Sequence, residues 1–243
     1  MLEDGQRIRS EVGTPQGGGV SPLLANIYLH YVLDLWANRW RQRARGDVII
    51  VRYADDFIVG FQYEAEARRF WAELARRLTR FGLELHPEKT RLLEFGRFAA
   101  ETRKRNGRGK PESFEFLGFT HVCGKNRSGK FCLLRRTSRK RFRRKLREVK
   151  TELRRRLHEP VPEVGKWLEA VFRGHLNYYG VPLNAPALHS FRHSLIWLWR
   201  RALSRRSQTG YVTWQRIHRI ARRWLPPVRI THPYPSERLC LST

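Results

Sequence analysis

Two adjacent carboxylates, Asp55 and Asp56, are the side chains of this sequence with the clearest chemical potential. They interrupt an otherwise largely apolar stretch, residues 48–61 (VIIVRYADDFIVGF). Neighbouring carboxylates repel each other, and burial near a core disfavours the charged form of both. A bound cation offsets these costs, and oxygen ligands in a partly hydrated site suit Mg²⁺. Two Mg²⁺ ions held by aspartates support nucleotidyl transfer, in which one activates an attacking 3′-oxygen and the other steadies the leaving pyrophosphate. The alternative is a polar turn that holds both groups in water.

Apolar periodicity predicts the elements that must position this pair. Residues 48–61 read as two short strands broken at Ala54-Asp55-Asp56, which predicts a β-hairpin. Residues 23–40 predict a buried helix that begins at Ser21-Pro22, and residues 64–81 predict an amphipathic helix that ends at Gly82. The remaining predicted elements are two strands in each of 83–95 and 113–134, a loop over 97–111, and helices over 138–158, 163–179, 186–205 and 213–224.

The charge of the chain is large and unevenly distributed. The 243 residues hold 49 Lys and Arg against 22 Asp and Glu, a net charge of +27 at pH 7. Residues 1–96 hold 14 basic against 13 acidic residues, whereas residues 97–243 hold 35 against 9. A field of this size needs a polyanion, and nucleic acid is the default partner. No apolar stretch approaches the twenty or so residues of a membrane span, so we expect no membrane partner.

Four short motifs give the sequence a resemblance to a known family. Residues 53–56 (YADD) resemble the Y-x-D-D signature of reverse transcriptases. Residues 13–30 (GTPQGGGVSPLLANIYLH), 83–90 (LELHPEKT) and 114–119 (FEFLGF) resemble three further blocks of group II intron-encoded reverse transcriptases, in the same order. The basic helices, with HLNYYG at 175–180 and HPYP at 232–235, resemble the thumb, or maturase, region of these proteins.

The resemblance implies an α+β fold. Residues 1–134 would form a partial reverse-transcriptase palm, an antiparallel sheet with helices, and residues 135–243 an all-α, basic thumb/maturase domain. It further implies an RNA-directed DNA polymerase, a nucleotidyltransferase of a mobile element that uses a two-metal Mg²⁺ site, deoxynucleoside triphosphates and an RNA/DNA template-primer. The implied catalytic residues are Asp55, Asp56 and Lys89, with both aspartates as metal ligands. The residues implied to contact template and primer are Gln16, Gly17, Tyr53, Ala54, Phe116, Leu117 and Gly118. From the residues alone, Lys89 is equally well a solvated lysine after a turn.

The family pattern also shows what the sequence does not contain. Polymerases of this class take a third carboxylate from an earlier strand, and Glu3, Asp4 and Glu11 lack the apolar strand setting that this role requires. We therefore expect an N-terminally truncated chain without fingers, inactive alone, with a fingers/palm segment as a partner in trans. A gene fragment, an alternative start and a split enzyme all remain open.

The basic region suggests a second function. Residues 138–158 surround a sparse apolar stripe with like charges, which destabilise a free helix and imply a phosphate-rich partner. The candidate RNA-binding residues are Arg139, Lys140, Arg143, Arg144, Arg147, Arg154 and Arg155. Trp197 and Trp199 lie among arginines and would stack on unpaired bases, although we expect one of them in the core. The alternative is thus that the chain is a non-catalytic, maturase-like protein that binds intron RNA and assists splicing. A third alternative is that it is an unstable remnant of a decayed element. The resemblance places the protein in a bacterial cytoplasm, associated with RNA or the nucleoid.

Two further pairs of residues give weaker evidence of a function. His189 and His193 are four residues apart on a predicted helix, but no third ligand accompanies them, and we interpret the pair as facing phosphate or solvent. Cys123 and Cys132 flank a predicted turn, and with Cys240 they suggest free thiols in a reducing compartment.

Overall fold

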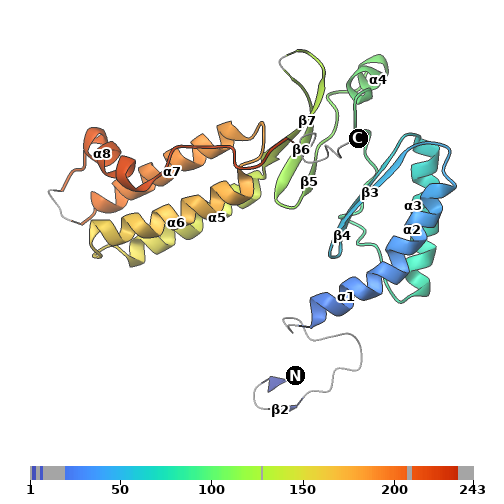
Figure 1. Ribbon diagram of the computed structural model, residues 1–243, viewed down its shortest axis with the longest axis horizontal. Coiled ribbons are helices and arrows are strands. Elements are labelled where there is room, and N and C mark those ends of the chain that lie inside the picture. The colour runs from blue at the N-terminus through green and yellow to red at the C-terminus, as the bar shows by residue number, and fades with distance from the viewer. Residues whose placement is uncertain (1, 4–5, 8–19, 127, 207–209, 235–243) are drawn as a thin grey trace. The chain divides into compact units, whose positions relative to one another are not determined.

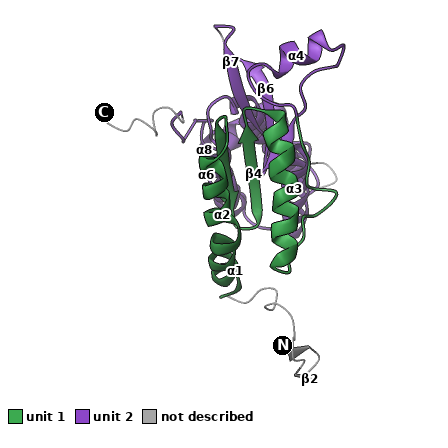
Figure 2. Ribbon diagram, turned by 90° about the vertical axis from the view of Figure 1, so that its right-hand side faces the viewer, with its two compact units in different colours: residues 1–93 green, residues 94–243 purple. Residues whose placement is uncertain are grey.

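The computed structural model describes residues 2–3, 6–7, 20–126, 128–206 and 210–234. Helices and small antiparallel sheets alternate along the first half, and helices alone follow, which confirms the predicted α+β class (Figure 1). The chain divides into two compact units, residues 1–93 and 94–243 (Figure 2). The predicted functional boundary between residues 134 and 135 is a different division and stays a prediction. Among the described helices, none is long and apolar enough to cross a membrane.

The first unit is built on one long helix, a hairpin and a second helix. Its elements are the strand pair β1 (Leu2–Glu3) and β2 (Gln6–Arg7), α1 (Ser21–Leu29), the π-helical turn η1 (His30–Asp34), α2 (Leu35–Gln42), β3 (Val48–Tyr53), β4 (Asp56–Phe61) and α3 (Glu64–Arg80). Val48, Phe61 and their alternate neighbours on one face of the hairpin join a core whose buried members are Val32, Leu33, Ala37, Trp40, Val48, Phe70, Leu74 and Leu78. The predicted hairpin and the predicted helix over 64–81 are therefore confirmed.

The prediction of a buried helix over 23–40 is correct only for its second half. Val32, Leu33 and Ala37 are buried, whereas Leu23 and Ile27 remain 61% and 48% exposed. A continuous helix from residue 21 to 42 is about 33 Å long, but a six-residue strand is only about 20 Å long. The small hairpin therefore cannot cover the whole helix within this unit.

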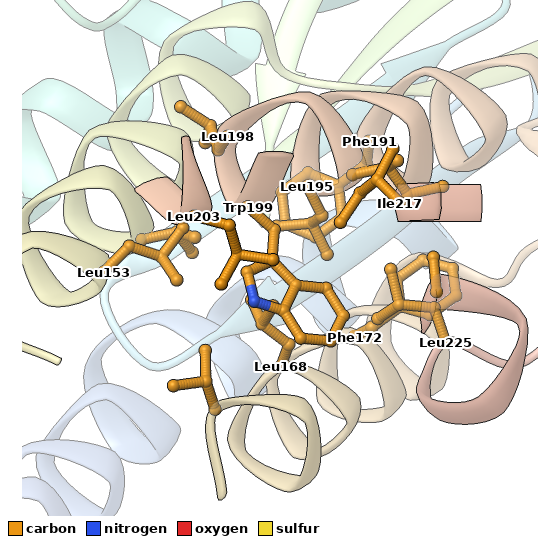
Figure 3. Packing of buried hydrophobic residues seen from close by; sticks show 14 of the residues in the cluster. Leu153, Leu168, Phe172, Phe191, Leu195, Leu198, Trp199, Leu203, Ile217 and Leu225 are labelled. Atoms are coloured by element: carbon orange, nitrogen blue, oxygen red, sulfur yellow. The ribbon is translucent and has the colours of Figure 1, made fainter. Parts of the chain in front are cut away.

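The second unit combines a three-stranded sheet with four long helices. Its elements are α4 (Ala99–Arg105), β5 (Phe114–Phe116), β6 (Phe119–Lys125), β7 (Phe131–Thr137), α5 (Arg139–Arg155), α6 (Val161–Tyr179), α7 (Ala185–Leu203) and α8 (Trp214–Trp224). The strands form an antiparallel sheet in the order β5-β6-β7. Helices α5 to α8 enclose an apolar core around Leu168, Phe172, Phe191, Leu195 and Trp199 (Figure 3). The four predicted helices after residue 138 are confirmed within a few residues.

Three local predictions between the hairpin and α5 are wrong. Residues 83–95 form no strand, because a strand needs a hydrogen-bonded neighbour and the described residues offer this segment none. The predicted loop over 97–111 contains α4, whose first turn carries Glu101 and whose last turn carries basic residues, an arrangement that the helix dipole favours. Residues 113–134 hold parts of three strands instead of two, because Leu117-Gly118 forms an extra tight turn.

Candidate active site

The paired aspartates lie at the tip of the β3–β4 hairpin. Tyr53 pairs with Asp56, so Ala54 and Asp55 form a two-residue loop. Ala54 adopts a positive φ of 53°, which the common two-residue hairpin loops require at their first residue. The small side chain of alanine limits the steric cost of this left-handed backbone conformation. Asp55 and Asp56 are both exposed, and Tyr53 is 65% exposed. The prediction that burial disfavours the charged form of both carboxylates is therefore wrong for this chain, because both side chains are exposed to water.

Arg52 anchors this turn to the long helix. Its guanidinium donates two hydrogen bonds to the carboxylate of Asp34, at 2.7 and 2.6 Å, and one to Asn26 Oδ1 at 2.8 Å. The same Nη1 donates to the carbonyl oxygen of Ala54 at 2.8 Å. One side chain thus joins α1, η1 and the strained residue of the turn. Sequence inspection missed this group, although an arginine directly before YADD in an apolar strand was a usable signal.

The π-helical turn places the partner of this arginine. Asp34 ends η1, and in this turn the N–H of Leu35 donates to the carbonyl of His30, five residues earlier. The hydrogen bonds from Arg52 lower the pKa of Asp34 more than its partial burial raises it. Asp34 in turn raises the pKa of Arg52. The pair is therefore charged at neutral pH, and its two hydrogen bonds fix the position of Arg52 next to the turn. Single π-helical turns are frequent at functional sites.

The remaining predicted residues of the first unit are not joined to the aspartates. Lys89 is exposed in a turn in which its N–H and that of Thr90 donate to the carbonyl of His86. Among the described residues, no hydrogen bond or ion pair links Lys89 to Asp55 or Asp56. Gln16 and Gly17 lie outside the described residues, so their predicted contact with the template stays a prediction.

The predicted primer-positioning residues form a second tight turn, in the other unit. Leu117 and Gly118 join β5 to β6 with φ values of 48° and 76°, while Phe116 pairs with Phe119. The carbonyl of Leu117 accepts a hydrogen bond from Tyr178 Oη at 2.8 Å, and that of Gly118 accepts one from the N–H of Ser138 at 2.9 Å. The turn is therefore held by α6 and by the start of α5.

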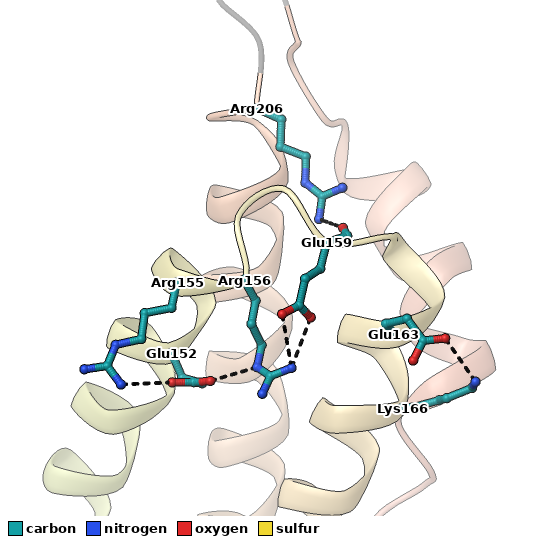
Figure 4. A network of polar contacts seen from close by, with 7 residues as sticks. All are labelled: Glu152, Arg155, Arg156, Glu159, Glu163, Lys166 and Arg206. Carbon is teal, nitrogen blue, oxygen red and sulfur yellow. Dashed lines mark hydrogen bonds and ion pairs between the residues drawn. The ribbon is translucent and has the colours of Figure 1, made fainter.

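The predicted RNA-binding residues share helix α5 and are all exposed. They are Arg139, Lys140, Arg143, Arg144, Arg147, Arg154 and Arg155. Arg144 pairs with Glu148 and Arg155 with Glu152, while the other five have no carboxylate partner among the described residues. Figure 4 shows where acids gather instead, at the end of α5, where Glu152 lies between Arg155 and Arg156 and Glu159 binds Arg156. Most of the exposed charge on this helix is therefore available to phosphate.

The two tryptophans proposed to stack on bases have different environments. Trp199 is 1% exposed and belongs to the core, as expected for one of them, whereas Trp197 is 41% exposed and lies under the guanidinium of Arg201 at 5.2 Å. His189 and His193 are both exposed on α7. Tyr211 and Trp214, which sequence inspection missed, are exposed and contact Arg200.

The donor set at the hairpin tip fits Mg²⁺ only in part. Two adjacent exposed carboxylates supply the hard oxygen ligands that the ion prefers. Over the part of the chain that the structure describes, however, no three His, Cys, Asp or Glu side chains are grouped as a metal site. Asp55 and Asp56 would therefore need a further carboxylate from elsewhere to complete a two-metal centre.

One family model matches the part of the chain that contains this hairpin. Residues 2–121 match the model of the family described as reverse transcriptase (RNA-dependent DNA polymerase). The match includes both tight turns and covers just under half of the 243 residues. A comparison with curated proteins found no match. The part of the chain from residue 2 to residue 121, which contains the exposed aspartate pair, is therefore similar in sequence to reverse transcriptases.

Proposed function

We propose that residues 2–121 act as part of the palm of an RNA-directed DNA polymerase encoded by a group II intron. The proposal rests on the exposed Asp55-Asp56 turn, which lies inside the segment that matches reverse transcriptases. A hydrogen bond from Arg52 to the carbonyl oxygen of Ala54 holds this turn in place. A rigid turn that presents carboxylates to solvent suits a site that must receive both a primer end and a nucleotide.

Each residue of the turn has a distinct role in this proposal. Asp55 and Asp56 would hold Mg²⁺, which when bound activates the primer 3′-oxygen and neutralises the pyrophosphate. Ala54 is small and leaves room for the primer terminus beside Tyr53. The 3′-oxygen forms a bond to the α-phosphorus of the nucleotide, and the bond between that phosphorus and pyrophosphate breaks. The exposed ammonium of Lys89 would approach the triphosphate and offset its charge as pyrophosphate leaves.

Primer extension tests this function. The 243 residues, an RNA template, a DNA primer, Mg²⁺ and deoxynucleoside triphosphates would be combined with and without a separately produced fingers-plus-first-palm segment of a related reverse transcriptase. We expect extension only in the mixture, because the described residues supply two carboxylates of the site and no third. Asp55→Asn should abolish that extension, while Asp47→Asn, which changes another acidic residue of the same unit, should not. No extension in any mixture would contradict the proposal, and Asp55-dependent extension by the 243 residues alone would contradict the expected inactivity.

A second candidate function is structured-RNA binding by the basic helical region, as in a maturase. It is favoured by seven exposed cations of α5 that lack a carboxylate partner among the described residues, Arg139, Lys140, Arg141, Arg143, Arg147, Lys150 and Arg154. A shallow, open hollow of about 620 Å³ between α5 and α6 lies on this face, and it is lined by four cations, Arg144, Lys145, Arg147 and Arg155, by two acids, Glu148 and Glu152, and by Trp167. Filter binding to a folded intron RNA over a series of salt concentrations tests this function. The logarithm of the affinity should fall steeply with the logarithm of the salt concentration, and Arg143→Gln with Arg147→Gln should reduce the slope by about 1 to 2. An unchanged slope would contradict a phosphate contact by α5.

A further inference from the structure

Helices α7 and α8, together with Tyr211 shortly before α8, carry a row of stacked flat groups on their surface. The guanidinium of Arg200 lies over the ring of Tyr211 at 5.0 Å and over the ring of Trp214 at 4.7 Å. The indole of Trp214 is stacked with His193 at 6.0 Å and 12°, and with His218 at 5.6 Å and 28°. These five side chains, Tyr211, Arg200, Trp214, His193 and His218, form what we call the stacking row.

Hydrogen bonds fix the middle of the stacking row. Arg200 Nε donates to the carbonyl oxygen of Val212 at 2.8 Å, and Nη2 donates to Tyr211 Oη at 2.7 Å. Thr213 caps α8 by accepting a hydrogen bond from the N–H of Arg216, which sets the orientation of the helix that begins at Trp214. The planar groups are therefore ordered before any ligand arrives, which reduces the entropy lost on binding.

The row is nevertheless open to solvent. Tyr211 is 71% exposed and Trp214 38% exposed, and both histidines are exposed. Large aromatic rings are normally drawn into a core, and the neighbouring Trp199 shows that the same two helices can bury an indole completely. An ordered but uncovered stack of rings is suited to receive another flat group.

The charge around the row selects an anionic ligand. Between residues 185 and 234 the sequence has ten arginines and no Asp or Glu. The exposed arginines of these helices include Arg201, Arg216, Arg219, Arg222 and Arg223. A ligand that combines flat rings with regularly spaced negative charge is a nucleic-acid strand whose bases are unpaired. A duplex offers the phosphates but keeps its base faces covered by neighbouring bases.

We propose that the stacking row binds unpaired nucleotides of an RNA strand, with a base on the open face of Tyr211 and phosphates on the surrounding arginines. The site lies outside the matched segment, on side chains of α7, of α8 and of Tyr211, and it deepens the RNA-binding candidate function without depending on polymerase activity. It would give the helical region a preference for single-stranded segments of a folded RNA, whereas α5 would contact phosphates of any RNA.

Three labelled probes of equal length separate base stacking from charge. They are a 12-nucleotide unstructured oligouridylate, the same backbone with abasic residues, and a 12-base-pair RNA duplex. Fluorescence anisotropy at a fixed salt concentration gives the affinity of the 243-residue chain for each. Because one stacked base contributes a factor of about 5 to 150, we expect the base-containing strand to bind at least about fivefold more tightly than the abasic strand.

Two variants remove the rings while keeping an apolar side chain. Tyr211→Leu and Trp214→Leu should each weaken binding of the oligouridylate by about fivefold or more and leave the abasic strand and the duplex within about twofold. Tyr211→Phe keeps the ring and should retain the wild-type preference. Trp71→Leu is the matched control, because Trp71 is 37% exposed on α3 in the other unit.

The possible outcomes separate this site from the general RNA-binding function. Equal losses for all three probes, or no loss for the oligouridylate, would overturn the stacking proposal. The stacking proposal would also be overturned if the wild-type chain bound the duplex but bound the oligouridylate and the abasic strand equally well. That result would still be consistent with phosphate binding by α5. Vesicles of phosphatidylcholine with phosphatidylglycerol serve as a fourth probe. If the leucine variants lose vesicle binding and keep oligouridylate binding, the row contacts a lipid surface and the proposal is wrong.

Discussion

Acidification should destabilise the helical region through one buried histidine. His175 is 6% exposed on α6 and stacks on Phe191 with ring centroids 3.7 Å apart. Its Nε2 is buried without a hydrogen-bond partner among the described residues. Burial lowers the pKa of His175 from 6.5 to about 4, and the positive charge of Lys145 adds to this effect. The folded state therefore holds a neutral imidazole where the unfolded state would bind a proton.

The sign and size of the effect follow from these two pKa values. Because the folded pKa lies below the unfolded one, the contribution to stability is complete above pH 6.5 and is lost as the pH falls toward 4. Each unit of pKa difference corresponds to about 1.4 kcal/mol, so this group should destabilise the folded state by about 2 kcal/mol at pH 5 and by about 3 kcal/mol near pH 4.

Urea unfolding followed by circular dichroism at 222 nm measures this loss. The free energy of unfolding would be compared at pH 7.5 and pH 5.0 for the wild type and for His175→Phe, which keeps a flat ring against Phe191 but cannot bind a proton. The variant should lose about 2 kcal/mol less than the wild type between the two pH values. His158→Phe removes an exposed histidine and should follow the wild type. Parallel pH dependence in the wild type and His175→Phe would refute the reasoning.

Three further substitutions test individual contacts by thermal or urea unfolding. Gly165→Ala would place a Cβ 2.6 Å from the Trp224 ring, so it should destabilise the helical unit by about 1 to 3 kcal/mol despite the better helix propensity of alanine; an increase in stability would show that the ring can move away freely. Arg52→Met leaves Asp34 without its bidentate partner and should cost about 1 to 3 kcal/mol, with partial recovery in Arg52→Lys; equal values for both variants would argue against the paired geometry. Asn184→Leu leaves the buried N–H of Thr137 without an acceptor and should cost about 1 to 3 kcal/mol, and a smaller cost would mean that this N–H finds another partner.

Local signals determined much of the fold and of the candidate site. Alternating apolar residues around a polar break predicted the hairpin over 48–61, and periodic leucines and aromatics predicted the helices after residue 138. The positions of Asp55 and Asp56 at a strand-to-strand turn followed from the same pattern. These features depend on neighbours within a few residues, so the sequence contains the information needed to predict them. Residues 83–95 show the limit, because alternation without a partner strand gives no strand.

Only the tertiary structure decided which groups face water and which face each other. The exposure of the aspartate pair depends on where the hairpin packs on α2 and α3, and the partners of Arg52 lie 18 and 26 residues away. The stacking row joins Arg200 of α7 to Tyr211, which precedes α8, and His193 of α7 to Trp214 of α8. Trp199 is buried in the core, whereas Trp197 is exposed. Such contacts are set by how apolar helix faces pack together, since that packing fixes which side chains from distant segments meet and which remain exposed.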